Sequence, residues 1–90
     1  DSKNAIAYAN RCESNYLLGN LKSALLDCNM ALKINSSISR AYYFRASINL
    51  ALDNKKEACD DFKKAGENKE AREYLTSNEG GWCLDMDNSI

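Results

Sequence analysis

Apolar residues along the chain recur at steps of three and four, the spacing that brings side chains to one face of an α-helix. The first such stripe is formed by Ala5, Tyr8, Ala9, Cys12 and Tyr16. It ends at Gly19-Asn20, a pair typical of a helix end and a turn. The second stripe runs through LKSALLDCNMALKI, residues 21–34, and stops at Asn35-Ser36-Ser37. The pattern predicts two helices joined by a tight turn.

The same pattern returns 34 residues later, and this register aligns ten identical residues without a gap. The pairs are Ala7 and Ala41, Tyr8 and Tyr42, Arg11 and Arg45, Asn15 and Asn49, Leu18 and Leu52, Asn20 and Asn54, Lys22 and Lys56, Ala24 and Ala58, Asp27 and Asp61, and Ala31 and Ala65. A second helical hairpin is therefore expected, with helices at 41–52 and 55–65.

A shorter apolar stripe follows the two hairpins. Asn68 is a suitable helix cap, and Ala71, Tyr74 and Leu75 share one face of the segment behind it. Stacked hairpins leave their last face bare, so a helix over about 68–77 suits a covering role. The predicted organisation is two hairpins, about 5–38 and 39–70, with a capping helix inside residues 1–79, and an extended or disordered tail over 80–90.

Composition supports an all-α fold. The chain has no proline, histidine or valine, while alanine, leucine, lysine and glutamate are plentiful. Its 12 basic and 13 acidic residues give no field that would recruit nucleic acid or an anionic membrane. No apolar run approaches the length of a membrane span. These features favour a cytoplasmic location and predict neither a nucleic-acid nor a membrane partner.

The repeat resembles the tetratricopeptide repeat, a helix-turn-helix unit of 34 residues. The resemblance rests on aromatic positions at Tyr8, Tyr42 and Phe62, small positions at Cys12, Ala46, Ala24, Ala58, Ala31 and Ala65, and turn positions at Gly19 and Asp53. It implies hairpins stacked as a short right-handed superhelix. Arg11 and Arg45 depart from the family pattern, which has leucine at that position.

The resemblance also implies a protein-interaction scaffold in which the first helix of each repeat lines a concave groove. Carried over to this chain, the groove positions are Ile6, Ala9, Asn10, Glu13 and Leu17 in the first copy, and Arg40, Tyr43, Phe44, Ser47 and Ala51 in the second. The residues predicted to bind a peptide or partner are Asn10, Glu13, Leu17, Arg40, Tyr43, Phe44 and Ser47. The alternative for Phe44 is packing between the repeats.

Some relatives hold a partner's terminal carboxylate between asparagine and basic residues on these helices. Asn10 and Arg40 match that pattern, but Phe44 stands where a second basic residue is expected. A full carboxylate clamp is therefore not predicted.

Nothing in the chain predicts catalysis, a cofactor or a metal site. A cysteine nucleophile needs a base or a cationic neighbour, and the chain has no histidine. Asp60-Asp61 and Asp85-x-Asp87 lack the ligand pattern of a calcium loop and are interpreted as solvated surface.

The four cysteines, Cys12, Cys28, Cys59 and Cys83, form no pair with metal-ligand spacing. The first three lie on apolar faces and are expected to act as small core residues. A Cys12–Cys28 bridge is the alternative, because the two occupy facing positions. Cys83 lies in the polar tail and is expected to be exposed and reactive.

The tail alternates apolar Trp82, Leu84 and Met86 with polar residues, a period of two that fits an extended strand. It is expected to dock in a groove of its own chain or of a neighbouring copy, and the second case would give a homo-oligomer. The alternatives are a disordered end and a segment that belongs to a further domain. The alternative functions are an accessory helical domain of a larger enzyme and a self-associating structural repeat.

Two helices approach closely only where one of them offers a small side chain. Ala24→Leu or Ala58→Leu is therefore expected to overpack its hairpin and cost about 1 to 3 kcal/mol. Thermal unfolding followed by circular dichroism measures the loss. An unchanged melting temperature in either variant would contradict the assignment of these positions.

Overall fold

The computed structural model describes residues 2–77 and 80–83 and is built from α-helices. Their bounds are α1 (Ser2–Leu17), α2 (Leu21–Ile34), α3 (Ser39–Ala51), α4 (Lys55–Lys64) and α5 (Lys69–Thr76). No strand occurs in the part of the chain that is described. The predicted all-α fold is confirmed. None of the helices in these two ranges is long and apolar enough to cross a bilayer.

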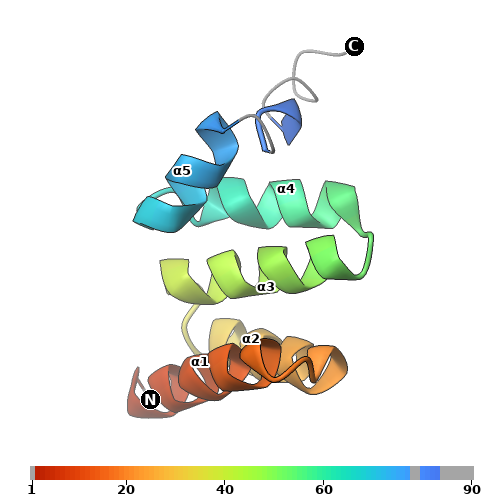
Figure 1. The fold of residues 1–90 in the computed structure, drawn as a ribbon. Helices are drawn as coiled ribbons and strands as arrows, with labels where there is room; N and C mark the ends of the chain where they lie inside the picture. Colours follow the sequence, from red (N-terminus) through yellow and green to blue (C-terminus); the bar gives the residue numbers. More distant parts are fainter. Residues whose placement is uncertain (1, 78–79, 84–90) are drawn as a thin grey trace.

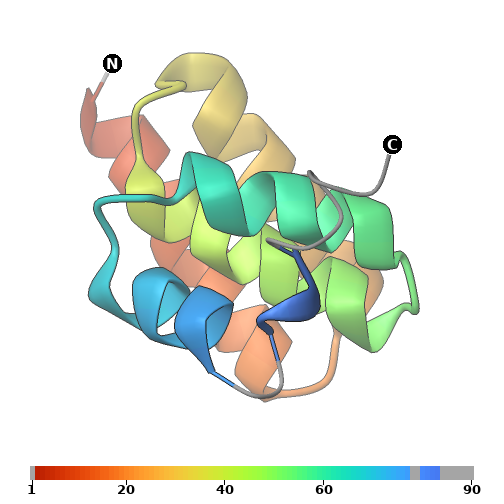
Figure 2. The same ribbon diagram turned by 90° about the horizontal axis from the view of Figure 1, so that it is seen from above.

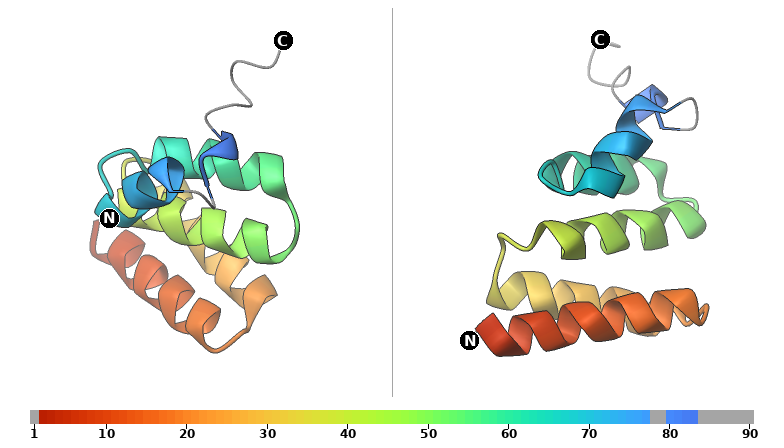
Figure 3. Two further views of the ribbon diagram at one scale, coloured as in Figure 1. Left: turned by 45° about the horizontal axis from the view of Figure 1, so that its top comes forward. Right: turned by 60° about the vertical axis from the view of Figure 1, so that its left-hand side comes forward.

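The helices form a stack of tiers (Figure 1). The α1–α2 hairpin lies at one end, the α3–α4 hairpin packs on it, and α5 lies on the far side of the second hairpin (Figure 3, right). Seen along the stack, successive tiers lie over one another, so α3 is covered on both sides (Figure 2). This arrangement is the helical repeat that the 34-residue period predicts.

Both hairpin turns use the left-handed backbone region. Gly19 has a φ of 82° and Asp53, one repeat later, has a φ of 65°. After each, the backbone N–H of an asparagine closes the turn at 2.8 Å, from Asn20 to the Asn15 carbonyl and from Asn54 to the Asn49 carbonyl. The two turns are therefore copies of one backbone geometry, and glycine suits it because it has no Cβ.

Helix α5 is capped and packed as a cover. The Asn68 side-chain oxygen accepts a hydrogen bond from the Ala71 N–H at 2.9 Å. Ala71 and Leu75 are buried in one cluster with Phe62 of α4, and the Tyr74 ring stacks on the Phe62 ring with centroids 4.3 Å apart. These contacts bury the face of α4 that the hairpin itself leaves open.

Alanine fills the places where helices meet. Ala24, Ala31, Ala41, Ala46, Ala58 and Ala65 all have 0 % of their surface exposed. Because alanine projects only a methyl group, the paired helices approach closely at these points and larger side chains pack beside them. The predicted role of the small positions in α2 and α4 agrees with this burial.

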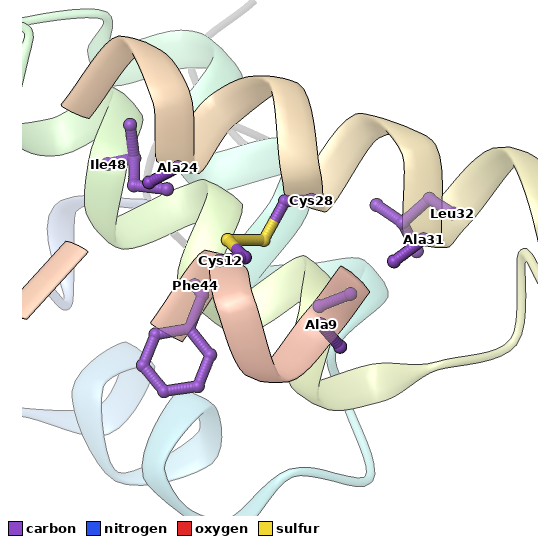
Figure 4. Close-up of a cluster of buried hydrophobic side chains, with 9 residues drawn as sticks. Ala9, Cys12, Ala24, Cys28, Ala31, Leu32, Phe44 and Ile48 are labelled. Carbon is purple, nitrogen blue, oxygen red and sulfur yellow. A yellow bond between two sulfur atoms is a disulfide. The ribbon is translucent and has the colours of Figure 1, made fainter. Parts of the chain in front are cut away.

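The two central cysteines of the first hairpin form a disulfide between α1 and α2 (Figure 4). Cys12 and Cys28 are both fully buried. The expectation of two unbonded core residues is therefore wrong, and the bridge that was the alternative is present. In the second hairpin the same two positions hold Ala46 and Phe62. The disulfide thus occupies the volume that a small–aromatic pair fills one repeat later.

The second disulfide joins Cys59 of α4 to Cys83. Cys83 is fully buried, so the expectation of an exposed, reactive thiol is also wrong. Residues 80–83 form a turn that runs into helical backbone, not the extended strand that the alternation predicts. Trp82 packs against the cluster of α4 and α5, while Leu84 and Met86 lie outside the described residues. The homo-oligomer through these three side chains stays a prediction.

Gly80 lets this turn approach α5. It is buried, and a Cβ built on it would collide with the Tyr74 carbonyl oxygen and ring. The Gly81 N–H donates to the Ser77 carbonyl at 2.8 Å, and the Cys83 N–H to the Gly80 carbonyl at 3.0 Å. Glycine is required here because no side chain fits between the turn and Tyr74.

No described cysteine is left free. Disulfides form and persist in oxidising compartments and are rare in the cytosol. The two bridges therefore count against the cytoplasmic location that the sequence favours.

The equivalence of Cys12–Cys28 with Ala46–Phe62 predicts a stable replacement. Without the bridge, closure of its loop is lost, worth about 3 kcal/mol. The Cys12→Ala/Cys28→Phe variant keeps the core filled, whereas Cys12→Ala/Cys28→Ala also leaves a cavity worth about 2 to 4 kcal/mol more. Urea unfolding should rank them in that order. If phenylalanine at position 28 brings no gain over alanine, the two hairpins do not share one packing arrangement.

Candidate functional site

The predicted binding residues lie on α1 and α3, the first helices of the two hairpins. Five of the seven line one hollow of about 330 Å³, which we call the α5 hollow because α5 forms one of its walls. Its lining residues are Glu13, Tyr16, Leu17, Arg40, Tyr43, Phe44, Asn68 and Glu70. The structure therefore brings together positions that are far apart in the sequence.

A second hollow adjoins the first and shares Tyr16 and Tyr43 with it. We call it the α3 hollow; its volume is about 340 Å³. The lining residues are Tyr16, Tyr43, Ser47, Leu50, Ala51, Phe62 and Tyr74. It contains Ser47, the sixth predicted residue, and apart from that hydroxyl its walls are mostly aromatic and aliphatic.

Arg40 connects the two hairpins across this surface. Its Nη1 donates to Glu13 Oε1 at 2.6 Å, and its Nη2 donates to Asn10 Oδ1. The guanidinium carbon also lies 6.0 Å from the centre of the Phe44 ring. Asn10 thus lines neither hollow but holds Arg40 in place. Because Arg40 already has a carboxylate partner, its charge is neutralised within the chain.

Phe44 packs between the hairpins, which is the alternative that the sequence leaves open. It is 9 % exposed and belongs to the cluster formed with α1 and α2. The rings of Tyr43 and Tyr16 lie 5.2 Å and 6.0 Å from it, centre to centre. Phe44 is therefore a buried residue that supports Tyr16 and Tyr43, which are both more accessible.

The structure also locates the three remaining positions that the resemblance assigned to the groove. Ala9 is almost fully buried and cannot reach the groove, because its helix face meets the core. Ile6 is exposed but lines neither hollow. Ala51 lines the α3 hollow, as carried over.

The sequence interpretation missed several lining residues. Tyr16 and Leu50 are separated by one repeat and both line the α3 hollow, so the 34-residue register could have identified them as a pair. Asn68, Glu70 and Tyr74 come from the capping helix. That helix does not follow the repeat register, and no sequence signal places it beside α3.

A bidentate ion pair joins the two helices of each hairpin. Arg11 donates to both carboxylate oxygens of Asp27, at 2.9 and 2.7 Å. Arg45 does the same with Asp61 at 2.8 and 2.9 Å. The departure of both arginines from the family's leucine therefore has a structural explanation: each binds the aspartate of its own second helix. Asp61 is buried, so its interpretation as solvated surface is wrong, whereas Asp60 is exposed.

The two pairs differ in burial. The Arg11 side chain is 65 % exposed, but the Arg45 side chain is 23 % exposed, because α2 covers it and Asn29 accepts from its Nη1 at 3.0 Å. Hydrogen bonds from Arg11, and a further bond from Asn15, hold the pKa of Asp27 below its ordinary value, although burial opposes the shift. The Asp61 carboxylate raises the pKa of Arg45.

Among the residues described, no group of three acidic, cysteine or histidine side chains could hold a metal ion. The chemistry of the two hollows is that of noncovalent recognition, with aromatic faces, amides and carboxylates.

Comparisons with known proteins agree with the fold. No family model and no solved structure matches the chain. The chain is 32% identical to Tetratricopeptide repeat protein 12 of Mus musculus over 62 residues, 69% of this chain and 9% of that protein. It is 34% identical to the Homo sapiens protein of the same name over 59 residues, 66% of this chain and 8% of that protein. The chain belongs to the tetratricopeptide repeat family.

A third relative aligns over more of the chain. RNA polymerase II-associated protein 3 of Xenopus laevis is 34% identical over 79 residues, 88% of this chain and 12% of that protein. The chain spans about a tenth of the length of these curated relatives. As a tetratricopeptide repeat unit, it is a protein-interaction module in the general sense of that family.

The Arg–Asp ion pairs of the two hairpins predict a pH-dependent loss of stability. Asp27→Asn is expected to lower the melting temperature at pH 7 by about 5 °C, because an amide cannot replace a charged, bidentate acceptor. The folded-state pKa of Asp27 is lowered, so its contribution is complete above the ordinary carboxylate range and disappears as pH falls through the lowered value. The gap between wild type and variant should therefore close in acid.

Asp60→Asn is the matched control, since Asp60 is exposed beside Asp61 and should change the melting temperature little. Asp61→Asn should cost more than Asp27→Asn, because it removes the carboxylate partner of the less exposed arginine. Equal losses in all three variants would show that the ion pairs contribute nothing specific.

Proposed function

We propose that this tetratricopeptide repeat unit is a non-enzymatic scaffold whose two adjoining hollows receive an extended peptide or a partner's helix. The observation that carries the proposal is the convergence of α1, α3 and α5 on one surface, where the α5 and α3 hollows share Tyr16 and Tyr43. The repeat units would be residues 5–38 and 39–70, with α5 as the cap.

The surface has the features of a peptide site. Half-buried aromatic side chains supply apolar area at low cost in side-chain entropy, and amide and carboxylate groups at the edge fix orientation. The volume of each hollow lies at the lower end of the range for ligand pockets, which suits single side chains of a longer segment. The partner is therefore expected to be a protein, bound through successive side chains.

Exposed leucines on different helices allow a controlled test. Leu17 lines the α5 hollow and is 72% exposed, and Leu26 on α2 is 70% exposed and lines neither hollow. Leu17→Lys/Ser47→Lys would block both hollows, and Leu26→Lys/Met30→Lys is the control outside them. Neither variant removes a fully buried side chain, so both should fold, as checked by circular dichroism.

Affinity capture from cells that express the protein, read by quantitative mass spectrometry, compares wild type with the two variants. At least one protein should be retained by wild type and by the Leu26 variant, and reduced at least fivefold with the Leu17 variant. Equal retention by all three would place the binding surface elsewhere.

A further inference from the structure

The α5 hollow carries an unbalanced negative charge. Glu13 and Arg40 neutralise each other at 2.6 Å, while the third charged residue of the lining, Glu70, forms no ion pair with any described residue. The lining residues that the structure describes therefore carry one net negative charge, and Arg40, the cation among them, is already bound to Glu13. A carboxylate ligand would meet repulsion there, whereas a cation would gain a partner.

The rings beside Glu70 favour the same ligand. Tyr16 and Tyr43 line the hollow and are only half-buried, and a cation is attracted to the face of an aromatic ring. The chain already uses this attraction at the site, since the Arg40 guanidinium lies 6.0 Å from the Phe44 ring. One hollow lined by a carboxylate and by two half-buried tyrosine rings suits an ammonium or guanidinium group.

The adjoining α3 hollow favours a different kind of side chain at the next position of the bound segment. Its lining includes Leu50, Ala51, Phe62 and Tyr74, none of which carries a formal charge. Because Tyr16 and Tyr43 belong to both hollows, one extended segment could place consecutive side chains in the two. The second side chain would then be apolar.

We infer that the ligand of this surface is a peptide segment with a lysine or arginine next to a large apolar residue, the cation beside Glu70 in the α5 hollow and the apolar side chain in the α3 hollow. The inference rests on the proposed function, because it specifies what the same groove receives. It follows from the neutralised Arg40, from Glu70, which has no ion-pair partner within residues 2–77 and 80–83, and from the two shared tyrosines.

The test uses four synthetic eight-residue peptides that differ at one position, with Lys-Leu, Arg-Leu, Gln-Leu or Glu-Leu at the centre of a Gly/Ser background. Each is titrated into isotopically labelled protein, and amide chemical shifts report both affinity and location by NMR. The Lys and Arg peptides should bind at least fivefold tighter than the Gln peptide and at least tenfold tighter than the Glu peptide. Higher salt should reduce the difference.

Two glutamates give a matched pair of variants. Glu70→Gln should reduce the preference for Lys over Gln to less than twofold, while Glu67→Gln, an exposed residue outside the lining, should leave it unchanged. The melting temperature of both variants is measured first, because Glu70 lies in the first turn of α5.

The outcomes separate the two proposals. If all four peptides shift the groove amides with equal affinity, the cation inference is overturned and the proposed groove stands. If the peptides shift amides only outside the two hollows, or none binds at millimolar concentration, the cation inference is also overturned. If the Glu70→Gln variant keeps the preference for the Lys peptide, the inference that Glu70 binds the cation is overturned.

Discussion

Close contact between helices at alanine positions is the constraint on which the rest of this structure depends. No surface is exposed on Ala24 and Ala31 of α2, on Ala41 and Ala46 of α3, on Ala58 of α4, or on Ala65 directly after it. A methyl group lets the backbones approach, and the larger side chains then fill the spaces beside the contact. The pairing of helices in each hairpin, the stacking of the hairpins and the burial of α3 on both sides all depend on this contact. The two hollows are lined by side chains of α1, α3, α4 and α5.

The two hairpins share this frame but complete it with different chemistry. The space between the paired helices is filled by a disulfide in the first and by alanine and phenylalanine in the second. The turn, with its left-handed residue, and the bidentate Arg–Asp pair are common to both. Packing volume can therefore change between repeats, while the backbone geometry and the ion pair are kept. The second disulfide likewise joins two segments of the chain: it bonds Cys83, in the turn formed by residues 80–83, to Cys59 of α4.

The charge that this surface offers a partner depends on which of its charged side chains are already paired within the chain. Arg40 is the residue most suggestive of a carboxylate ligand, yet it is bound to Glu13 and Asn10 and bridges the hairpins. What is left for a partner is aromatic surface and the carboxylate of Glu70. The list of groove residues favours neither ligand charge, and it is this internal pairing that supports the basic segment proposed for the surface. Phe44 contributes by supporting the tyrosines from below.

The sequence by itself determined the helices, the repeat and the turns, because helical periodicity and glycine or aspartate in the left-handed region are local properties. The resemblance to the tetratricopeptide repeat also placed Glu13, Arg40, Tyr43 and Ser47 on one surface, because it implies that the first helix of each repeat lines a groove. Only the tertiary structure decided that Cys12 bonds Cys28, that Cys83 is buried, and that Glu70 and Tyr74 join the groove. A disulfide, an ion pair and the placement of a capping helix depend on distances between segments far apart in the chain. No spacing along a single helix encodes those distances.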